Sequence, residues 1–581
     1  MRTPNSGSSS RVTMACGGIA LIACLVVIAS TPNDAYWVVD SGSKALLAHR
    51  LLETGYGELN FDYPAAHLDP EGIAFPIPPP YAVPRGDGFV SQYPPFYSAI
   101  ASLFLAVLGD AGLRVPAAIG VAACALLFCT WVAPAVGRSW AVAGGLALAI
   151  ATPLFFYGIT VWEHSLTVAL SLGAWVALSR WSRSRLLLAG FLIATACWLR
   201  AELVLMGVSL GVGCYLRRRR PSDVVTLAAG AFPAVAGLVA FNATLFGDPL
   251  GIHVARNVAV ATGSPVAAAD LVARAAALMS GFGGSSAEGA LLGLGIASCL
   301  VLGVVAARHE TGVPQVLWLA LAVGVVASLY GSVQTASARV PWIVLAHYNG
   351  FLIRLPAICL AGVGAVQVWR RPVYGPLRLG IGAGLGFLAL ALAFRVTLTD
   401  FMAGGHWGPR MLLPAVPAIV ALALVALRGE VANASPRRAR YWLAGSAALI
   451  AVGLASTGVA VWILTQQKLE ARRLQQAILA APQPVIVTSY QPLAQQLATI
   501  WGRKPMLLAS SAPAFESIVA ALDRHGIESF LLLRRPAAGG GPDRLAGKAR
   551  CELDSRFRGR GAPYVFDVDL YACTIGAGHR R

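Results

Sequence analysis

The chain has 581 residues, of which 57% are hydrophobic by a wide count and 12% are charged, and its mean hydropathy is +0.66. So few charged side chains cannot cover the surface of a soluble protein of this size, which argues against the soluble classes. The net charge of +18 does not indicate nucleic-acid binding, because the arginines gather in short loops between apolar runs, where they set membrane topology and contact anionic lipids.

Apolar runs of roughly 18–22 residues recur along the chain, close to the ~20 that span ~30 Å of hydrocarbon. Backbone groups in lipid must satisfy their own hydrogen bonds, so these runs predict helices. We expect a polytopic α-helical membrane protein with about thirteen spans. Counting 186–216 as two short helices, they lie near 12–30, 114–133, 140–157, 163–179, 186–216, 223–245, 287–307, 313–333, 351–369, 379–397, 411–427 and 442–464.

The distribution of basic residues predicts the orientation of the chain. Arg2 and Arg11 precede the first span, which places the N-terminus in the cytoplasm of a multi-pass plasma (inner) membrane protein. The next segment, 31–96, is rich in Pro, Tyr and acidic residues, and is expected outside as a long loop. Surface helices are predicted at 41–54 and 96–108. The odd number of spans then puts the C-terminal part outside, in the periplasm.

The segment 186–216 is too short for two full spans, although basic loops at Arg180–Arg185 and Arg217–Arg220 place both its ends on the cytoplasmic side. It therefore predicts a short helical hairpin with its tip near Arg200-Ala201-Glu202. Ionisable groups within a membrane are costly, so this arginine and glutamate are functional candidates.

The tail alternates strand-like and helical patterns, which predicts a small external α/β domain over 466–581, following a transmembrane module over 1–465. Strands are expected at 484–488, 506–508 and 530–533, and helices at about 491–501 and 512–525. An external location permits a disulfide between Cys551 and Cys573, with free thiols as the alternative. The other eight cysteines lie in or beside apolar runs as small hydrophobes.

Asp40 follows the first span at the membrane surface, in Asp40-Ser41-Gly42-Ser43-Lys44. A carboxylate there is placed to act as general base on an external acceptor hydroxyl. The alternative is a helix N-cap, which favours Asp. Tyr93, in Gln92-Tyr93-Pro94-Pro95-Phe96-Tyr97, and the pair Glu163-His164 are further candidates, with interfacial anchoring and capping as their structural alternatives.

Outward-facing arginines are unusual under the positive-inside rule, so Arg256, Arg339 and Arg410 call for an anionic partner such as a lipid phosphate. A solvated loop charge is the alternative. Two histidines, His347 and His406, lie in the same kind of segment. No spacing resembles a metal site, since His67 and Asp69 have no obvious companions, and neither a metal nor another cofactor is expected.

Taken in order along the chain, these motifs resemble the GT-C superfamily of membrane glycosyltransferases over approximately residues 12–465. The class includes protein O-mannosyltransferases and lipid A aminoarabinose transferases. The resemblance rests on the acidic residue after span one, the long external loop, and short motifs at matching places. These motifs are Tyr93-Pro94-Pro95, Leu113-Arg114, Leu199-Arg200-Ala201-Glu202, Phe246-Gly247-Asp248-Pro249-Leu250, and Gly408-Pro409-Arg410 with Leu412-Leu413-Pro414.

The resemblance implies inverting transfer of a sugar from a polyprenyl-phosphate-linked donor to a glycan, lipid or protein acceptor on the outer face. Asp40 is then the base, with Asp34 as the alternative, because many members carry an acidic pair where this chain has Asp40-Ser41. Donor phosphate is expected at Arg410 and also at Arg200, Lys44 and Arg256. The cavity is expected to be lined by Tyr93, Glu163, His164, His347 and His406.

A membrane transporter or lipid flippase is the competing function, and it would need a midplane site often built from internal repeats and broken helices. The two halves show no convincing repeat, and the long external loop and tail suit an acceptor site better. A third possibility, a receptor in which the bundle only anchors the tail, leaves thirteen spans unexplained.

Overall fold

The computed structural model describes residues 6–79, 81–255, 270–271, 274–275, 278–279, 287–309, 312–337, 350–397, 407–408, 410–535, 549–557 and 567–576. The chain divides into two compact units. The bundle unit comprises residues 1–27, 115–337 and 343–461, and the mixed unit comprises 28–114, 338–342 and 462–581. Two of the boundaries between the units fall inside helices. One lies after residue 27 within α1 (Ser6–Ser30), and the other lies after residue 461 within α20 (Pro436–Ala480).

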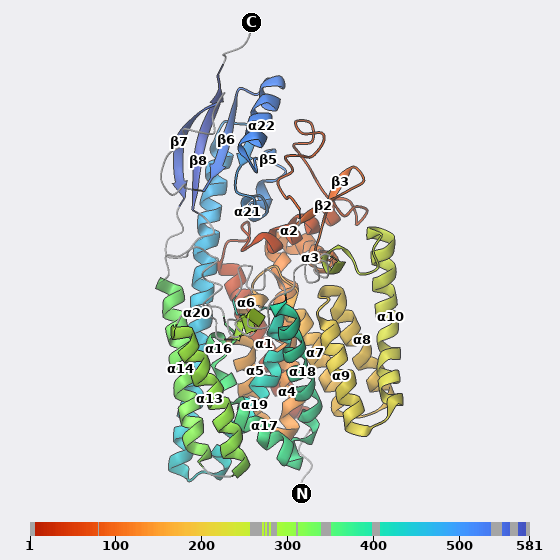
Figure 1. Ribbon diagram of the computed structural model, residues 1–581, viewed down its shortest axis with the longest axis vertical. Helices are drawn as coiled ribbons and strands as arrows, with labels where there is room; N and C mark the ends of the chain where they lie inside the picture. Colours follow the sequence, from red (N-terminus) through yellow and green to blue (C-terminus); the bar gives the residue numbers. More distant parts are fainter. Residues whose placement is uncertain are drawn as a thin grey trace. The chain divides into compact units, whose positions relative to one another are not determined.

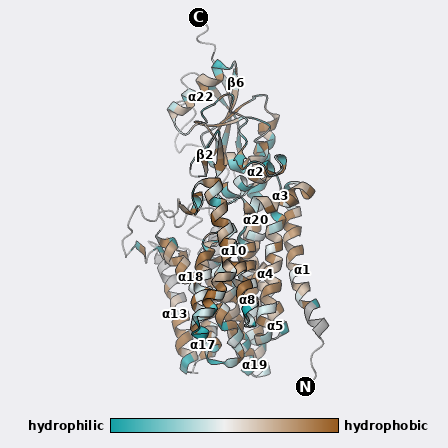
Figure 2. Ribbon diagram, turned by 90° about the vertical axis from the view of Figure 1, so that its right-hand side faces the viewer, coloured by the Kyte–Doolittle hydropathy of each residue, from teal (hydrophilic) through white to brown (hydrophobic). Residues whose placement is uncertain are grey.

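The rest of the bundle unit is helical, and its long helices run side by side (Figure 1). Hydrophobic residues dominate them, as Figure 2 shows for α4, α10 and α13. The elements are α4 (Val115–Val136), α5 (Arg138–Ile150), α6 (Leu154–Gly158), α7 (His164–Ser179), α8 (Arg183–Leu199), α9 (Leu203–Arg218), α10 (Pro221–Phe246), α13 (Ala287–His309), α14 (Val313–Ser337), α16 (Phe351–Arg354), η3 (Pro356–Leu360), α17 (Ala361–Arg370), η4 (Pro372–Tyr374), α18 (Gly375–Val396), η5 (Arg410–Ala415) and α19 (Val416–Asn433).

Within the described residues, seven helical segments are long and apolar enough to cross a membrane, which makes the chain a multi-pass membrane protein. The number thirteen stays a prediction. The predicted hairpin is confirmed: α8 and α9 have 17 and 16 residues, roughly 25 Å each, and Arg200-Ala201-Glu202 connects them. The seven segments are Arg11–Ser30, Phe96–Val136, Pro221–Phe246, Val313–Tyr330, Pro372–Val396, Arg410–Asn433 and Pro436–Ala480.

Three predicted spans are broken, and a proline accounts for each break. The run 140–157 stops at Ile150, just before Pro153, and resumes as the short α6. The run 351–369 is divided into α16, η3 and α17 around Pro356. The run from 411 begins as the 3-10 helix η5, which contains Pro414, before α19. Proline lacks the N–H that an α-helix needs and restricts the residue before it.

The mixed unit contains two sheets. A three-stranded antiparallel sheet has the order β1 (Asn60–Phe61), β3 (Gly88–Ser91), β2 (Ala82–Arg85). A five-stranded sheet has the order β5 (Met506–Leu508), β4 (Ile486–Thr488), β6 (Ser529–Arg534), β8 (Val568–Ile575), β7 (Ala549–Phe557). Its β5, β4 and β6 are parallel, whereas β8 is antiparallel to both β6 and β7. Strands β4, β5 and β6 lie where the sequence pattern predicts strands, at 484–488, 506–508 and 530–533, whereas β7 and β8 were not predicted.

The larger sheet packs against a hydrophobic core on each of its two faces. Successive side chains of a strand point to opposite faces, so each strand contributes to both cores. Val487, Phe530 and Leu532 face α22 (Ala512–Arg524), whose apolar positions Phe515, Ile518, Val519 and Leu522 complete one core. Ile486, Leu531 and Leu533 face a second core. That core holds the end of α20, α21 (Pro492–Gln496), η6 (Ala498–Ile500) and, from the first loop, α2 (Val39–Glu53). The segment 28–114 and the C-terminal segment thus fold as one unit, which also holds α3 (Phe96–Leu108) and η1 (Gly109–Arg114).

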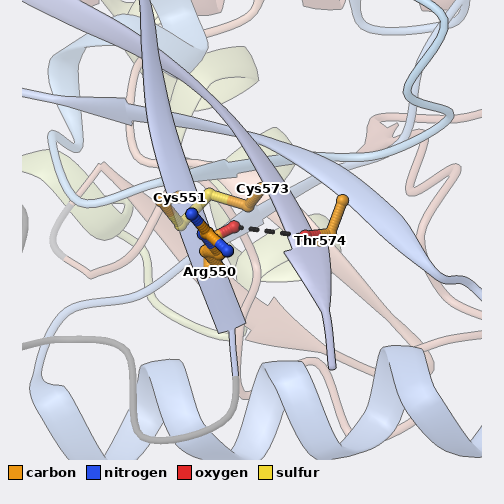
Figure 3. Close-up of a disulfide and its surroundings, with 4 residues drawn as sticks. All are labelled: Arg550, Cys551, Cys573 and Thr574. Atoms are coloured by element: carbon orange, nitrogen blue, oxygen red, sulfur yellow. Dashed lines mark hydrogen bonds between the residues drawn. A yellow bond between two sulfur atoms is a disulfide. The ribbon is translucent and has the colours of Figure 1, made fainter. Parts of the chain in front are cut away.

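A disulfide joins Cys551 of β7 to Cys573 of β8, the pairing that the sequence left open (Figure 3). The two residues lie directly opposite each other in the antiparallel register. Beside them, Thr574 Oγ1 donates a hydrogen bond of 3.5 Å to the Arg550 carbonyl oxygen. The disulfide therefore fastens the edge strand β7 to the neighbouring strand β8.

Candidate functional site

Asp40, Lys44 and Tyr93 form a buried cluster in the mixed unit, hereafter the Asp40 cluster. Asp40 lies in the first turn of α2, but the N-cap is Val38 and its side chain makes no capping hydrogen bond. The Tyr93 hydroxyl instead donates a 2.5 Å hydrogen bond to Asp40 Oδ1. Lys44 is one helical turn further on, and its Nζ lies 5.1 Å from the centroid of the Tyr93 ring. Asp40 is therefore engaged by a side chain from another element, and the capping alternative does not apply.

The small residues between Asp40 and Lys44 explain why these two side chains share a face. Gly42 lies on the opposite side of α2, against α21, where an added Cβ would approach the Gln495 carbonyl oxygen to 1.8 Å. Gln495 Nε2 also donates a 2.9 Å hydrogen bond to Ser43 Oγ. Because Ser-Gly-Ser packs tightly against α21, the ionisable pair is directed to the face that carries Tyr93. This packing leaves no room for any side chain at position 42.

Tyr93 is held by its own loop. Its backbone N–H donates a 3.1 Å hydrogen bond to Ser91 Oγ at the end of β3, and Pro95 is the N-cap of α3. Ser98, in the first turn of α3, donates a 2.9 Å hydrogen bond to the Lys44 carbonyl oxygen. The loop and α3 are thus fixed to α2 at both ends of the cluster. Asp40 and Lys44 are only 9% and 4% exposed.

Asp34, the alternative base, is in a different environment. Arg472 of α20 approaches both of its carboxylate oxygens at 2.9 Å through Nε, and Arg472 Nη2 lies 2.7 Å from Oδ1. The Asp34 backbone carbonyl accepts hydrogen bonds from Gln475 and Thr499. Asp34 therefore anchors the loop after α1 to the C-terminal elements through a charge-assisted pair with Arg472.

Two buried cations bind the backbone at the end of α1. Arg114 is 1% exposed and donates to Thr31 Oγ1 at 2.8 Å and to the Pro32 carbonyl at 3.3 Å. Lys468 Nζ donates to the same carbonyl at 2.9 Å. Nearby, burial raises the pKa of Tyr36 well above its ordinary value, and the charge of Asp110 adds to the effect. The Leu113-Arg114 motif thus has a structural explanation, since cations favour helix C-terminal carbonyls.

In the bundle unit, Glu163, His164, Arg200 and Glu202 form a second group, hereafter the Arg200 cluster. Arg200 Nη1 lies 3.1 Å from Glu163 Oε1 and 2.8 Å from His164 Nε2, and Nε contacts Glu202 Oε1. Nη2 donates to Met411 Sδ at 2.9 Å. Arg200 is 11% exposed, and its guanidinium is already matched to two carboxylates. The sequence-predicted Glu163, His164 and Arg200 therefore come together, but as an ion-paired group.

Aromatic rings surround this cluster and lead to two more arginines. The Tyr157 ring lies 4.7 Å from His164 and stacks on Trp162 at 5.3 Å between centroids. Arg410 Cζ lies 5.4 Å from the Trp162 centroid, and Arg354 Cζ lies 3.8 Å from the Trp407 centroid. These are cation–π distances, and such contacts help to hold a guanidinium in place.

Arg354 is not among the site residues predicted from the sequence, although it lies within the predicted apolar run 351–369. Arg354 is 1% exposed, ends the short helix α16, and donates a 3.2 Å hydrogen bond to Ser456 Oγ through Nη1. An arginine inside an apolar run, followed at once by Leu355-Pro356, was the available signal. Of the other predicted site residues, Arg256, His347 and His406 lie outside the described residues, as does Arg339.

His67 and Asp69 have structural roles in the mixed unit. The Asp69 carboxylate accepts hydrogen bonds from the Tyr63 hydroxyl at 2.6 Å and from the Ala74 N–H at 2.8 Å. Burial raises the pKa of Tyr63, so this phenol stays protonated and donates. His67 is exposed, with Nδ1 3.1 Å from the Pro64 carbonyl oxygen. In the part of the chain that the structure describes, no group of three or more His, Cys, Asp or Glu residues is arranged to hold a metal.

No protein-family model and no curated protein sequence matches the chain. Among solved structures, ArnT from Cupriavidus metallidurans in the apo state is similar, with a TM-score of 0.50 and 11% identity over 95% of this chain and 97% of that one. The same protein bound to undecaprenyl phosphate gives a TM-score of 0.49 with 12% identity over the same shares. The Archaeoglobus fulgidus oligosaccharyltransferase tethered to an acceptor peptide gives 0.49 with 12% identity, over 89% of this chain and 68% of that one.

The similarity to apo ArnT shows a common fold. ArnT is a membrane glycosyltransferase of the GT-C fold. The resemblance to the GT-C superfamily inferred from the motifs is thereby confirmed at the level of fold.

Proposed function

We propose that this protein transfers a sugar, with inversion, from a polyprenyl-phosphate-linked donor to an acceptor on the outer face of the plasma (inner) membrane. The observation that carries the proposal is the Asp40 cluster. A buried carboxylate is oriented by a neutral phenol and accompanied by a lysine on the same helical face. The GT-C fold supplies the reaction class, and the acceptor is a glycan, a lipid or a protein.

Asp40 is the general base in this proposal. Its carboxylate removes the proton from the acceptor hydroxyl as the oxygen attacks the anomeric carbon of the sugar. The bond between that carbon and the phosphate oxygen breaks, and polyprenyl phosphate leaves as an anion. Tyr93 fixes the orientation of the carboxylate by donating a hydrogen bond to Oδ1.

Arg410 is the principal group that we assign to the departing phosphate. Its guanidinium carbon lies 5.4 Å from the centroid of the Trp162 ring, and this contact positions the guanidinium group. Lys44 is a second cation for this role, and Arg256 is proposed on the sequence pattern. Arg200, which is engaged by Glu163 and Glu202, is better assigned to positioning than to direct phosphate binding. Tyr93, Glu163, His164, His347 and His406 remain proposed lining residues.

The direct test is transfer by the purified protein from a panel of labelled polyprenyl-phosphate hexoses and pentoses, followed by NMR of the product. We expect transfer from at least one donor, with the anomeric configuration of the product opposite to that of the donor. Retention of configuration would contradict the single-displacement mechanism. The competing function, a transporter or flippase, would be favoured by a different pair of results. The protein would move a fluorescent polyprenyl phosphate across the membrane of proteoliposomes, and it would transfer no sugar from any donor even when an envelope-glycan acceptor is supplied.

A further inference from the structure

A pocket in the bundle unit lies away from the Arg200 cluster, where two basic connections meet. The loop between α7 and α8 and the loop between α9 and α10 enclose a hollow of about 660 Å3. Its size is in the range of small-ligand sites. The polar lining consists of Trp181, Ser182, Arg183, Arg218, Ser222, Asp223 and Thr226.

The charge around this pocket is strongly positive. The segments 180–186 and 217–226 contain seven arginines and one acidic residue, Asp223. Membrane topology alone accounts for an excess of arginines in such loops. It does not account for a hollow that two of them line together with three hydroxyl side chains and a single carboxylate, that of Asp223. Hydroxyl and guanidinium groups together are the ligands that phosphate oxygens prefer, and the two guanidinium groups outweigh the one carboxylate.

The arginine side chains that line or flank the pocket are partly ordered before any ligand binds. The guanidinium carbons of Arg217 and Arg218 lie 4.8 and 5.2 Å from the centroid of the Trp181 ring, so one indole holds two cations. Ser182 Oγ accepts a 3.3 Å hydrogen bond from the Arg185 N–H, which fixes the first turn of α8. Ordered cations lose less conformational entropy when they bind an anion.

The two helices that carry the pocket are in very close contact just beyond it. A Cβ on Gly190 would approach the Leu227 carbonyl oxygen to 2.0 Å, and one on Gly230 would approach the Leu187 carbonyl oxygen to 2.1 Å. α8, α9 and α10 lie side by side (Figure 1). This contact holds Ser182 and Arg183 of one helix at a fixed distance from Ser222 and Thr226 of the other.

Apolar surface continues from the pocket along the same helices. Leu186 and Val225 line the hollow, and Leu188, Phe191 and Phe232 beyond it are 48%, 45% and 70% exposed. Only 17% of the most apolar window of α10 is buried. A ligand with a phosphate group and acyl chains would occupy both the basic pocket and the apolar surface beside it. A free phosphate or a soluble nucleotide would occupy only the pocket.

We propose that this pocket binds the headgroup of an anionic phospholipid, with the phosphate between Arg183 and Arg218 and the acyl chains along α8 and α10. The site is independent of the proposed sugar transfer. It would fix the α8–α10 part of the bundle to lipid on the side of the membrane where the basic loops lie.

The test is binding of phosphatidylglycerol to the purified full chain in detergent, measured by native mass spectrometry against phosphatidylcholine with the same acyl chains. We expect preferential binding of phosphatidylglycerol. The double variant Arg183→Gln/Arg218→Gln should bind it roughly 30-fold more weakly, since each cation near the surface contributes about a factor of five. Arg437→Gln/Arg438→Gln, which removes two charges from another basic loop, is the matched control and should bind as wild type.

Three results would overturn the proposal. The first is equal binding of the two lipids, and the second is an equal loss in both double variants, which would reduce the effect to general charge. The third is competition by glycerol 3-phosphate at micromolar concentration, which would identify a site for soluble phosphate. Arg183→Lys/Arg218→Lys guards against misfolding, because retained charge should restore the lipid preference.

Discussion

Two clusters of buried carboxylates, one in each unit, differ in what holds them. In the mixed unit, Asp40 accepts a hydrogen bond from the neutral phenol of Tyr93. In the bundle unit, Glu163 and Glu202 are both paired with the guanidinium of Arg200. Both environments favour the charged form of a carboxylate, a cation at close range more strongly than a hydrogen bond from a phenol.

The difference separates residues that position from residues that react. Asp34 supports this distinction, because it lies only six residues before Asp40 yet is bound at both oxygens by Arg472. The sequence ranks Asp40 and Asp34 as alternatives for one role. We propose different roles for them on the basis of these partners. The following variants test that proposal, in order of decreasing expected effect, and the variant of Asp40 itself comes last.

Arg200→Ala removes the guanidinium that pairs with Glu163 and Glu202, whose side chains are only 5% and 12% exposed. We expect a loss of stability of about 3 kcal/mol, because an uncompensated buried charge is costly. Thermal unfolding of the purified protein measures it, with the exposed Arg503→Ala as control. An unchanged melting temperature would show that the cluster is not a structural ion pair.

Arg410→Ala removes the guanidinium that we assign to the donor phosphate. We expect the KM for the polyprenyl-phosphate donor to rise roughly 30-fold, as when a charge-assisted contact of about 2 kcal/mol is lost. Steady-state kinetics with varied donor measures it, and the exposed Arg438→Ala is the matched control. If KM stays at the wild-type value, the phosphate is bound elsewhere.

Tyr93→Phe removes one hydroxyl and leaves the ring beneath Lys44. We expect kcat to fall about tenfold, since the carboxylate of Asp40 loses its orienting donor. The acidic limb of the pH–rate profile should also move to higher pH, because a hydrogen bond that favours the charged carboxylate is gone. A wild-type rate with an unmoved profile would separate Tyr93 from the base.

Asp34→Asn should have the smallest effect. The ion pair with Arg472 is more than one-third exposed, so its loss is expected to cost less than about 1 kcal/mol of stability. Transfer should stay within about twofold of wild type. Activity assays and thermal unfolding of the same preparation measure both, and a large loss of turnover with intact stability would return Asp34 to the candidates for the base.

Local patterns predicted much of the fold. The helical runs at 41–54 and 96–108 correspond to α2 and α3, and the tip of the hairpin lies at Arg200-Ala201-Glu202, where the run length requires it. The strands β4 and β6 and the helix α22 follow their apolar periods. Pro153 and Pro356 marked possible breaks, but α4 and α10 continue through Pro134 and Pro233, so a proline alone does not predict where a helix ends.

Contacts between distant residues were not predictable in this way. Asp34 and Arg472 are 438 positions apart, and no periodicity relates the first loop to the end of α20. The same holds for Tyr93 and Asp40, which are 53 positions apart. The motifs identified Asp40, Tyr93 and Arg200 as candidates. Their partners, which decide whether a carboxylate is a base or an anchor, required the three-dimensional structure.

The central claim is that Asp40 removes the proton from the acceptor. Single-turnover transfer by Asp40→Asn, with Asp34→Asn alongside and donor binding measured for both, tests it most directly. We predict a rate roughly 1,000-fold below wild type for Asp40→Asn, with donor affinity within about threefold, and a near-normal rate for Asp34→Asn. An Asp40→Asn enzyme that transfers within tenfold of wild type would contradict the account.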